Sequence, residues 1–122
     1  MSLEDHVPSF ELCRKWKEIG GRQDTIFVFC PMYNDTHDII SYTLEDRLII
    51  QNPKLKEDMI AAPLEGELME WMKEDIACIS WNNADEWVTE VINDGGLSVS
   101  YYRNKSLPNA LMQMAIWREG NK

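Results

Sequence analysis

Two alternating segments on either side of a glycine-rich turn constrain this fold more than any other feature of the sequence. Apolar and polar residues alternate in residues 86–92 and again in residues 97–102. Alternation over four to eight residues predicts a half-buried strand. The intervening Asn-Asp-Gly-Gly tolerates positive φ and predicts a hairpin. A third strand candidate, residues 76–81, precedes the turn at 82–85, so we expect an antiparallel meander with one face to be covered.

The segment that follows the meander is almost wholly apolar. Residues 106–117 read Ser-Leu-Pro-Asn-Ala-Leu-Met-Gln-Met-Ala-Ile-Trp, with Ser106 placed to cap a helix and Pro108 suited to its first turn. We expect this helix to cover the meander, which still leaves an excess of apolar side chains. We predict that the excess packs either against the first helix or against a second copy of the protein. The candidate interface residues are Met112, Ile116 and Trp117.

The N-terminal part of the chain predicts a helix and then a strand. Residues 9–21 favour a helix with Ser9 as its N-cap and with Gly20 and Gly21 at its end. Residues 25–30 resemble a buried strand, which we expect Pro31 to terminate. At helical spacing, four residues are expected to form the apolar face of this helix: Leu12, Cys13, Trp16 and Ile19.

A further helix is predicted over residues 63–75, where apolar residues again recur at helical spacing. The side chains expected to face the core are Leu64, Leu68, Met69, Trp71 and Met72. Residues 31–62 are harder to interpret, because they hold early turn signals followed by a short segment, 42–50, that suits a strand or a helix. We favour an extended segment or a marginal helix there, then an exposed loop around residues 52–53.

These elements predict an α+β fold. A chain of 122 residues has the size of one domain and can build a core without disulfides or metal. We expect a single domain over residues 1–122, with about three helices packed on an antiparallel sheet of three to four strands. We expect residues 1–8 to be flexible and residues 31–62 to be rich in loops.

The net charge of −9 is concentrated in one third of the chain. Residues 63–96 hold nine acidic residues and one lysine, a net charge of −8. This excess argues against direct binding to nucleic-acid phosphates or to an anionic membrane. The acidic face, which we assign to Glu67, Glu70 and Glu74, either meets a basic partner or only keeps the protein soluble.

The three cysteines, Cys13, Cys30 and Cys78, form no Cys-x-x-Cys pair. We find no signal peptide and no run of 18 apolar residues. We therefore expect a cytoplasmic protein whose thiols are reduced and buried.

Few residues suggest catalytic chemistry. Asp35, His37 and Asp38 could ligate a transition metal or act as acid and base, but we favour a polar turn as the explanation for them. Residues 81–87, Trp-Asn-Asn-Ala-Asp-Glu-Trp, offer oxygen ligands but lack the spacing of a calcium loop. No nucleotide-binding, zinc-protease or serine-hydrolase motif is present, and we predict no cofactor.

Three segments occur in an order that resembles a known group of proteins: residues 10–29 (FELCRKWKEIGGRQDTIFVF), 62–72 (APLEGELMEWM) and 106–117 (SLPNALMQMAIW). The ordered set resembles small uncharacterised proteins from phages and from prophages of gut bacteria. The matching residues are Leu12, Cys13, Trp16, Lys17 and Glu18, then Ala62 and Pro63, and finally Leu107, Pro108, Ala110 and Leu111. These are capping and packing positions, so the resemblance implies a genomic setting and no particular chemistry.

Three hypotheses for function follow. The leading one is a non-enzymatic phage or prophage accessory protein that acts by protein–protein contact, as a homodimer or with another protein. The second is an acidic decoy that occupies a nucleic-acid-binding surface of a host protein through residues 63–96. The third is a metal-dependent enzyme that uses His37 with Asp35 and Asp38.

Overall fold

The computed structural model describes residues 2–50, 55, 57–73, 78–92, 95 and 98–120. Their elements, in chain order, are the 3-10 turn η1 (Leu3–His6), α1 (Phe10–Glu18), β1 (Phe27–Tyr33), β2 (Ile39–Asp46), the 3-10 turn η2 (Arg47–Ile49), β3 (Ile60–Ala61), α2 (Glu65–Trp71), β4 (Cys78–Trp81), β5 (Trp87–Ile92), β6 (Ser98–Asn104) and α3 (Leu107–Gly120). The predicted α+β class is confirmed.

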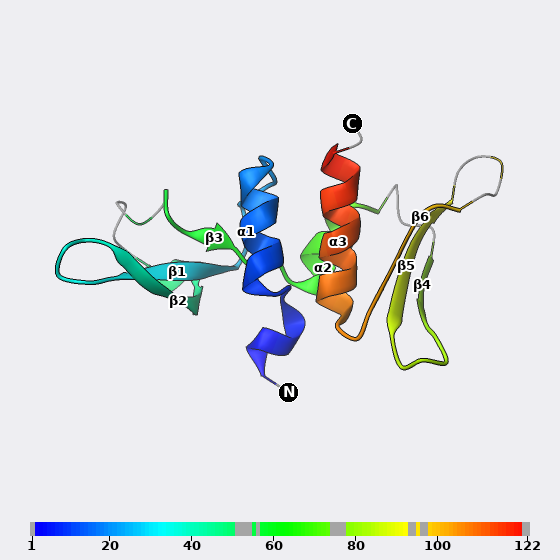
Figure 1. Cartoon of the computed structure of the whole chain (residues 1–122), viewed down its shortest axis with the longest axis horizontal. Helices are drawn as coiled ribbons and strands as arrows, with labels where there is room; N and C mark the ends of the chain where they lie inside the picture. Colours follow the sequence, from blue (N-terminus) through cyan, green and yellow to red (C-terminus); the bar gives the residue numbers. More distant parts are fainter. Residues whose placement is uncertain are drawn as a thin grey trace.

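The three helices lie between two antiparallel sheets (Figure 1). The N-terminal sheet has the strand order β2-β1-β3, and the C-terminal sheet has the order β4-β5-β6. The predicted meander followed by a helix is therefore present. The sequence led us to expect one sheet, whereas the chain also builds a second sheet from residues 27–61.

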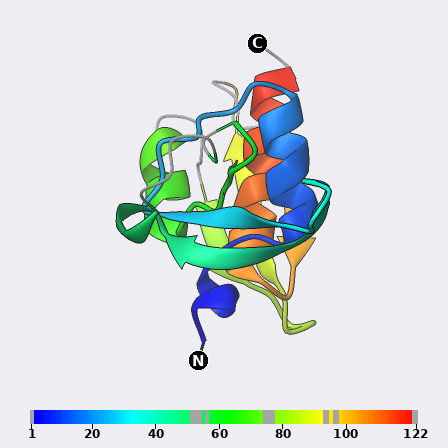
Figure 2. The ribbon, with the colours of Figure 1, turned by 90° about the vertical axis from the view of Figure 1, so that its left-hand side faces the viewer.

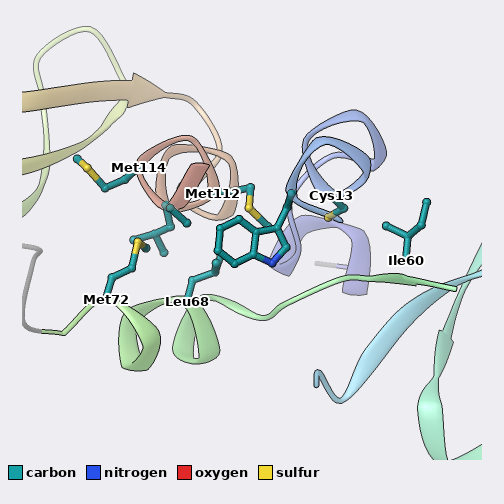
Figure 3. Packing of buried hydrophobic residues seen from close by; sticks show 9 residues of the cluster. Cys13, Ile60, Leu68, Met72, Met112 and Met114 are labelled. Atoms are coloured by element: carbon teal, nitrogen blue, oxygen red, sulfur yellow. The ribbon is translucent and has the colours of Figure 1, made fainter. Parts of the chain in front are cut away.

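Helix α3 is the centre of the structure. It contacts α1 and α2 on one side and strands β5 and β6 on the other. Met112 and Met114 leave the helix in opposite directions and are both buried (Figure 3). A helix that is covered on several sides must be apolar on several sides, which explains the composition of residues 106–117.

Polar contacts at the starts of α1 and α3 hold these helices together. The Oγ of Ser9 accepts the N–H of Leu12 at 3.4 Å, and the Oγ of Ser106 accepts the N–H of Asn109 at 3.3 Å. The side-chain oxygen of Asn109 accepts the N–H of Ser9 at 2.7 Å. Both predicted N-caps are therefore correct, and a main-chain donor at the cap of α1 is satisfied by α3.

The core cluster collects apolar side chains from all three helices (Figure 3). Trp16 of α1 stacks on Trp71 of α2, with ring centroids 6.1 Å apart and ring planes 12° apart. The Nε1 of Trp16 donates to the main-chain oxygen of Arg22 at 2.9 Å, which satisfies the polar atom of this buried ring. The core residues are Cys13, Trp16, Ile60, Leu68, Met72, Leu111, Met112, Met114 and Ala115.

Two local expectations are wrong. Pro31 does not end β1 but lies within it, opposite Tyr42 of β2. The main-chain oxygen of Phe27 faces β3, so by alternation the missing N–H of Pro31 points to that side too, beyond the end of the two-residue β3. Ile19 is 42% exposed, because α1 ends at Glu18 and Ile19 is its C-cap.

Residues 31–62 contain the extended segment that we favoured. Strand β2 covers residues 39–46 and pairs with β1, and η2 follows directly. The loop expected at residues 52–53 and most of the turn at 93–96 lie outside the described residues. At the N-terminus, where we expected flexibility, Val7 and Pro8 are buried.

The cysteines divide between core and surface. Cys13 is fully buried, and burial raises the pKa of its thiol to about 12. Cys30 is also buried, whereas Cys78, at the start of β4, is exposed. The expectation of three buried thiols is therefore wrong for Cys78.

Substitution of Gly21 tests how closely the chain approaches the Trp16 ring. A Cβ at Gly21 would lie 2.1 Å from Trp16 Cε2, whereas a Cβ at Gly66, inside α2, would meet nothing within 4 Å. We expect Gly21→Ala to lower the free energy of unfolding by about 2 kcal/mol or more. Gly66→Ala, the matched control, should raise it by about 0.5–1 kcal/mol. Urea unfolding measures both, and equal effects would contradict the packing of Trp16.

Thiol accessibility gives a separate test of the fold. At neutral pH, a thiol reagent should modify one cysteine rapidly in the native protein and three in denaturant. The reason is that a thiol must be exposed to form the reactive thiolate. Replacement of Cys78 by serine should abolish the rapid phase. Rapid modification of all three thiols without denaturant would show that the core around Cys13 is not closed.

Candidate interaction surface

Exposed apolar side chains concentrate beside the N-terminal sheet. Of the ten large apolar residues that are exposed in the described chain, six lie between residues 26 and 49. They are Ile26, Met32, Ile39, Ile40, Leu48 and Ile49. Leu48 is 87% exposed and Ile40 is 65% exposed. Such clustering, unlike scattered exposure, is typical of a contact surface.

Strand β2 connects the two ends of this cluster and forms one edge of its sheet (Figure 2). The bond from the N–H of Arg47 to the oxygen of Ile26 marks a pair whose main-chain groups face each other. By alternation along the register, Thr43 and Glu45 direct their main-chain N–H and C=O groups to β1. Tyr42 and Leu44 direct theirs to the open edge. We call β2 together with Ile26, Ile39, Ile40 and Leu48 the β2-edge surface.

A hollow of about 360 Å³ lies at the start of β2. Its walls include Ile39 and Ile40 together with three aromatic side chains. Phe10 of α1 packs on Tyr42 of β2 and on Phe29 of β1, with ring centroids 4.6 and 5.3 Å apart. This aromatic hollow can receive an apolar side chain.

A second hollow, of about 320 Å³, lies at the opposite end of β2. It is lined by Asp24, Thr25, Ile26, Arg47, Leu48 and Glu67. The guanidinium of Arg47 is turned towards the main chain, where its Nε donates to the oxygen of Thr25 at 2.7 Å and Nη2 donates to the oxygen of Gln23. These bonds hold Arg47 in place and leave Ile26 and Leu48 as the apolar part of this Arg47 hollow.

The end of β2 is acidic. Asp46 accepts the N–H of Leu48 at 2.9 Å and caps η2. The carboxylate of Glu45 has no hydrogen bond or ion pair with another described residue. The β2-edge surface therefore changes from apolar at Ile39 and Ile40 to anionic at Glu45 and Asp46.

The acidic face expected at Glu67, Glu70 and Glu74 is not a uniform set of free carboxylates. Glu67 is half-buried: its Oε1 accepts the N–H of Leu64 at 2.9 Å and its Oε2 accepts the N–H of Ile26 at 3.3 Å. Glu70 is exposed and pairs with Lys73 at 2.9 Å. Glu74 lies outside the described residues. An acid three residues after an N-cap is the sequence signal for the first of these roles.

The residues proposed as an interface on α3 are placed mainly inside the protein. Met112 is 0% exposed and belongs to the core cluster, whereas Ile116 and Trp117 are half-buried and pack against it. For Met112, contact with α1 and α2 therefore replaces contact with a second copy. The reason is that helices cover the side of α3 that we expected to contact either the first helix or a second copy.

The candidate metal ligands Asp35, His37 and Asp38 lie in the exposed turn between β1 and β2. The side-chain oxygen of Asn34 accepts the N–H groups of Thr36 and Asp38, and His37 has a φ of 64°. Within the described residues, no three His, Cys, Asp or Glu side chains are arranged to hold a metal ion. A turn explains this segment.

The turn between β4 and β5 is built in the same way. Asn82 accepts the N–H groups of Ala84 and Glu86 through its side chain, and Asp85 has a φ of 58°. Its polar residues therefore shape the chain between two strands.

A larger hollow, of about 630 Å³, lies around the start of α3 and contains a pair that the sequence did not indicate. The Nδ1 of His6 lies 2.8 Å from the Oε1 of Glu65. The hydroxyl of Ser106, which also lines this hollow, accepts a main-chain N–H as the cap of α3. The pair could move a proton, but the described lining holds no nucleophile aligned with it.

Comparison with known proteins found no matching family model, no matching curated protein and no matching solved structure. Each helix in the described part of the chain is too short or too polar to cross a bilayer.

Two of the glutamates of α2, Glu67 and Glu70, offer a direct test of the roles assigned to them above. We expect Glu67→Ala to lower the free energy of unfolding by about 1–2 kcal/mol, because two main-chain N–H groups lose a charged acceptor. Glu70→Ala should change it by less than about 0.5 kcal/mol, because its ion pair is exposed. Both variants lose one negative charge, so urea unfolding at low ionic strength separates the local role from net charge. Equal losses of unfolding free energy in the two variants would contradict the structural role of Glu67.

Proposed function

We propose that this protein is a non-enzymatic accessory protein that acts by protein–protein contact through the β2-edge surface. The observation that carries the proposal is the combination of an edge strand with exposed Ile39, Ile40 and Leu48 at its two ends. A partner that pairs with open main-chain groups and covers clustered apolar side chains lowers the free energy of both. The resemblance to phage and prophage proteins supplies the proposed biological setting, and we place the protein in the bacterial cytoplasm.

The rival hypotheses have less support. An acidic decoy would use Glu67, Glu70 and Glu74, but both carboxylate oxygens of Glu67 accept main-chain N–H groups. A metal-dependent enzyme would use His37, which lies in an exposed turn. A homodimer through α3 would require Met112, which is buried.

Site-specific photo-crosslinking in the bacterial host tests the proposal. A photoreactive phenylalanine analogue replaces Ile40 or Leu48 on the β2-edge surface, or Ile92 or Tyr101 on the C-terminal sheet. All four residues are exposed, so the second pair is a matched control. We expect one discrete crosslinked product from the first pair and none from the second, with circular dichroism confirming that each variant is folded.

Two results would contradict the proposal. No crosslinked product from Ile40 or Leu48 would mean that this surface has no partner in the cell. Equal products from all four sites would mean that the protein is crosslinked without a specific surface. A product of twice the protein mass, together with a dimer in light scattering, would identify the partner as a second copy.

A further inference from the structure

We infer that β2 binds an extended segment of another protein as an added antiparallel strand, and that this segment begins with basic residues and ends with apolar ones. The inference rests on the proposed function, because it specifies the partner of the same surface. Three observations carry it: the open edge of β2, the aromatic hollow at its start and the anionic groups at its end.

The open edge supplies main-chain hydrogen bonds. Tyr42 and Leu44 direct N–H and C=O groups away from β1, and within the described residues no strand pairs with β2 on that side. β2 has eight residues, so it can align roughly seven residues of a partner over about 23 Å. Strand addition uses such an edge for affinity and leaves side-chain pockets to determine specificity.

The start of β2 selects apolar side chains. Ile40 is 65% exposed, and the aromatic hollow beside it is bounded by Phe10, Phe29 and Tyr42. Covering Ile39 and Ile40 with a partner side chain would remove apolar area from water. The register between β1 and β2 shifts after Met32, which brings Tyr33 opposite Ile39 and leaves Ile40 as an extra residue at this end.

The end of β2 selects basic side chains. Glu45 has no ion pair with a described residue, and the guanidinium of Arg47 is engaged by main-chain oxygens. The residues at this end of β2 and around its hollow carry four carboxylates and two guanidiniums. The carboxylates are those of Asp24, Glu45, Asp46 and Glu67, and the guanidiniums are those of Arg22 and Arg47. A lysine or arginine could lay its aliphatic stem on Ile26 and Leu48 and direct its charge to Glu45.

The two ends determine the order of residues in the partner. In an antiparallel pair the beginning of one strand lies beside the end of the other. The partner segment must therefore present its basic residues first, beside Glu45 and Asp46, and its apolar residues last, beside Ile39 and Ile40. A parallel strand would require the reverse order.

The same pattern argues against β2 pairing with β2 of a second copy. Full antiparallel self-pairing would place Ile39 and Ile40 against Asp46 and Glu45, so that apolar groups would meet charges. Parallel self-pairing would place like carboxylates beside each other, which is unfavourable. Complementarity thus requires a different chain.

Nuclear magnetic resonance of the whole isotope-labelled protein tests the inference. The probe is the blocked peptide Lys-Arg-Thr-Val-Thr-Ile-Val at about 1 mM, a concentration that reveals dissociation constants near 1 mM. Controls are the same peptide in reverse order and a version with two glutamates in place of the basic residues. We expect shifts centred on the amides of Tyr42 and Leu44, and about tenfold weaker binding of the acidic peptide.

Peptide N-methylation separates strand addition from other binding. Only alternate N–H groups of an added strand face β2, so methylation of one alternating set should abolish binding while methylation of the other set should preserve it. This test leaves the protein unchanged and cannot fail through misfolding.

A pair of protein variants tests the charge complementarity. Glu45→Lys should weaken binding of the basic peptide about tenfold and strengthen binding of the acidic one. Glu57→Lys, which makes the same change of net charge at an exposed residue before β3, should change binding less than twofold.

The inference is overturned if no shifts occur at about 1 mM peptide, if the shifts lie outside β2, if both methylated sets bind, or if Glu45→Lys and Glu57→Lys behave alike. Crosslinking from Ile40 and Leu48 that persists beside such a result would leave the proposed contact surface intact and exclude strand addition as its mode.

Discussion

The burial of α3 on more than one side is the constraint on which the rest of this structure depends. Its apolar side chains point in opposite directions, with Met112 among the helices and Met114 on the other side (Figure 3). An apolar helix in water is unstable unless both sides are covered. The chain meets this need with α1 and α2 on one side and with β5 and β6 on the other, so the helices form a layer between two sheets (Figure 1).

The central position of α3 leaves the N-terminal sheet on the outside of the helices, where its edges are available for contact. The helices lie between this sheet and the C-terminal meander (Figure 1), and Phe10 of α1 packs on Phe29 and Tyr42 of the N-terminal sheet. One edge is β3, which is two residues long, and the other is β2, which is eight residues long. Short or charged edges limit unwanted pairing. β2 is neither short nor charged along most of its length, and this is why we assign the contact surface to it.

Polar side chains brace this sheet through main-chain atoms. Arg47 binds the oxygens of Gln23 and Thr25, Glu67 accepts the N–H groups of Leu64 and Ile26, and the Nζ of Lys17 donates to the oxygen of Met59 at 2.6 Å. Each of these charges hydrogen-bonds to the main chain, which holds its side chain in place. Part of the charge that looks available in the sequence therefore has a structural role, and Glu45, which lacks such a role, becomes the better candidate for recognition.

The sequence by itself determined the elements whose signals are local. The alternation in residues 86–92 and the caps Ser9 and Ser106 indicated strands and helices correctly, because periodicity and capping act within a few residues. Tertiary structure decided the rest. It placed Pro31 inside a strand because β3 ends before reaching it, buried Met112 because helices cover that side of α3, and brought Glu67 to Ile26, 41 residues earlier. The β2-edge surface could not be read from the sequence, because an edge exists only by reference to the strands that pair beside it.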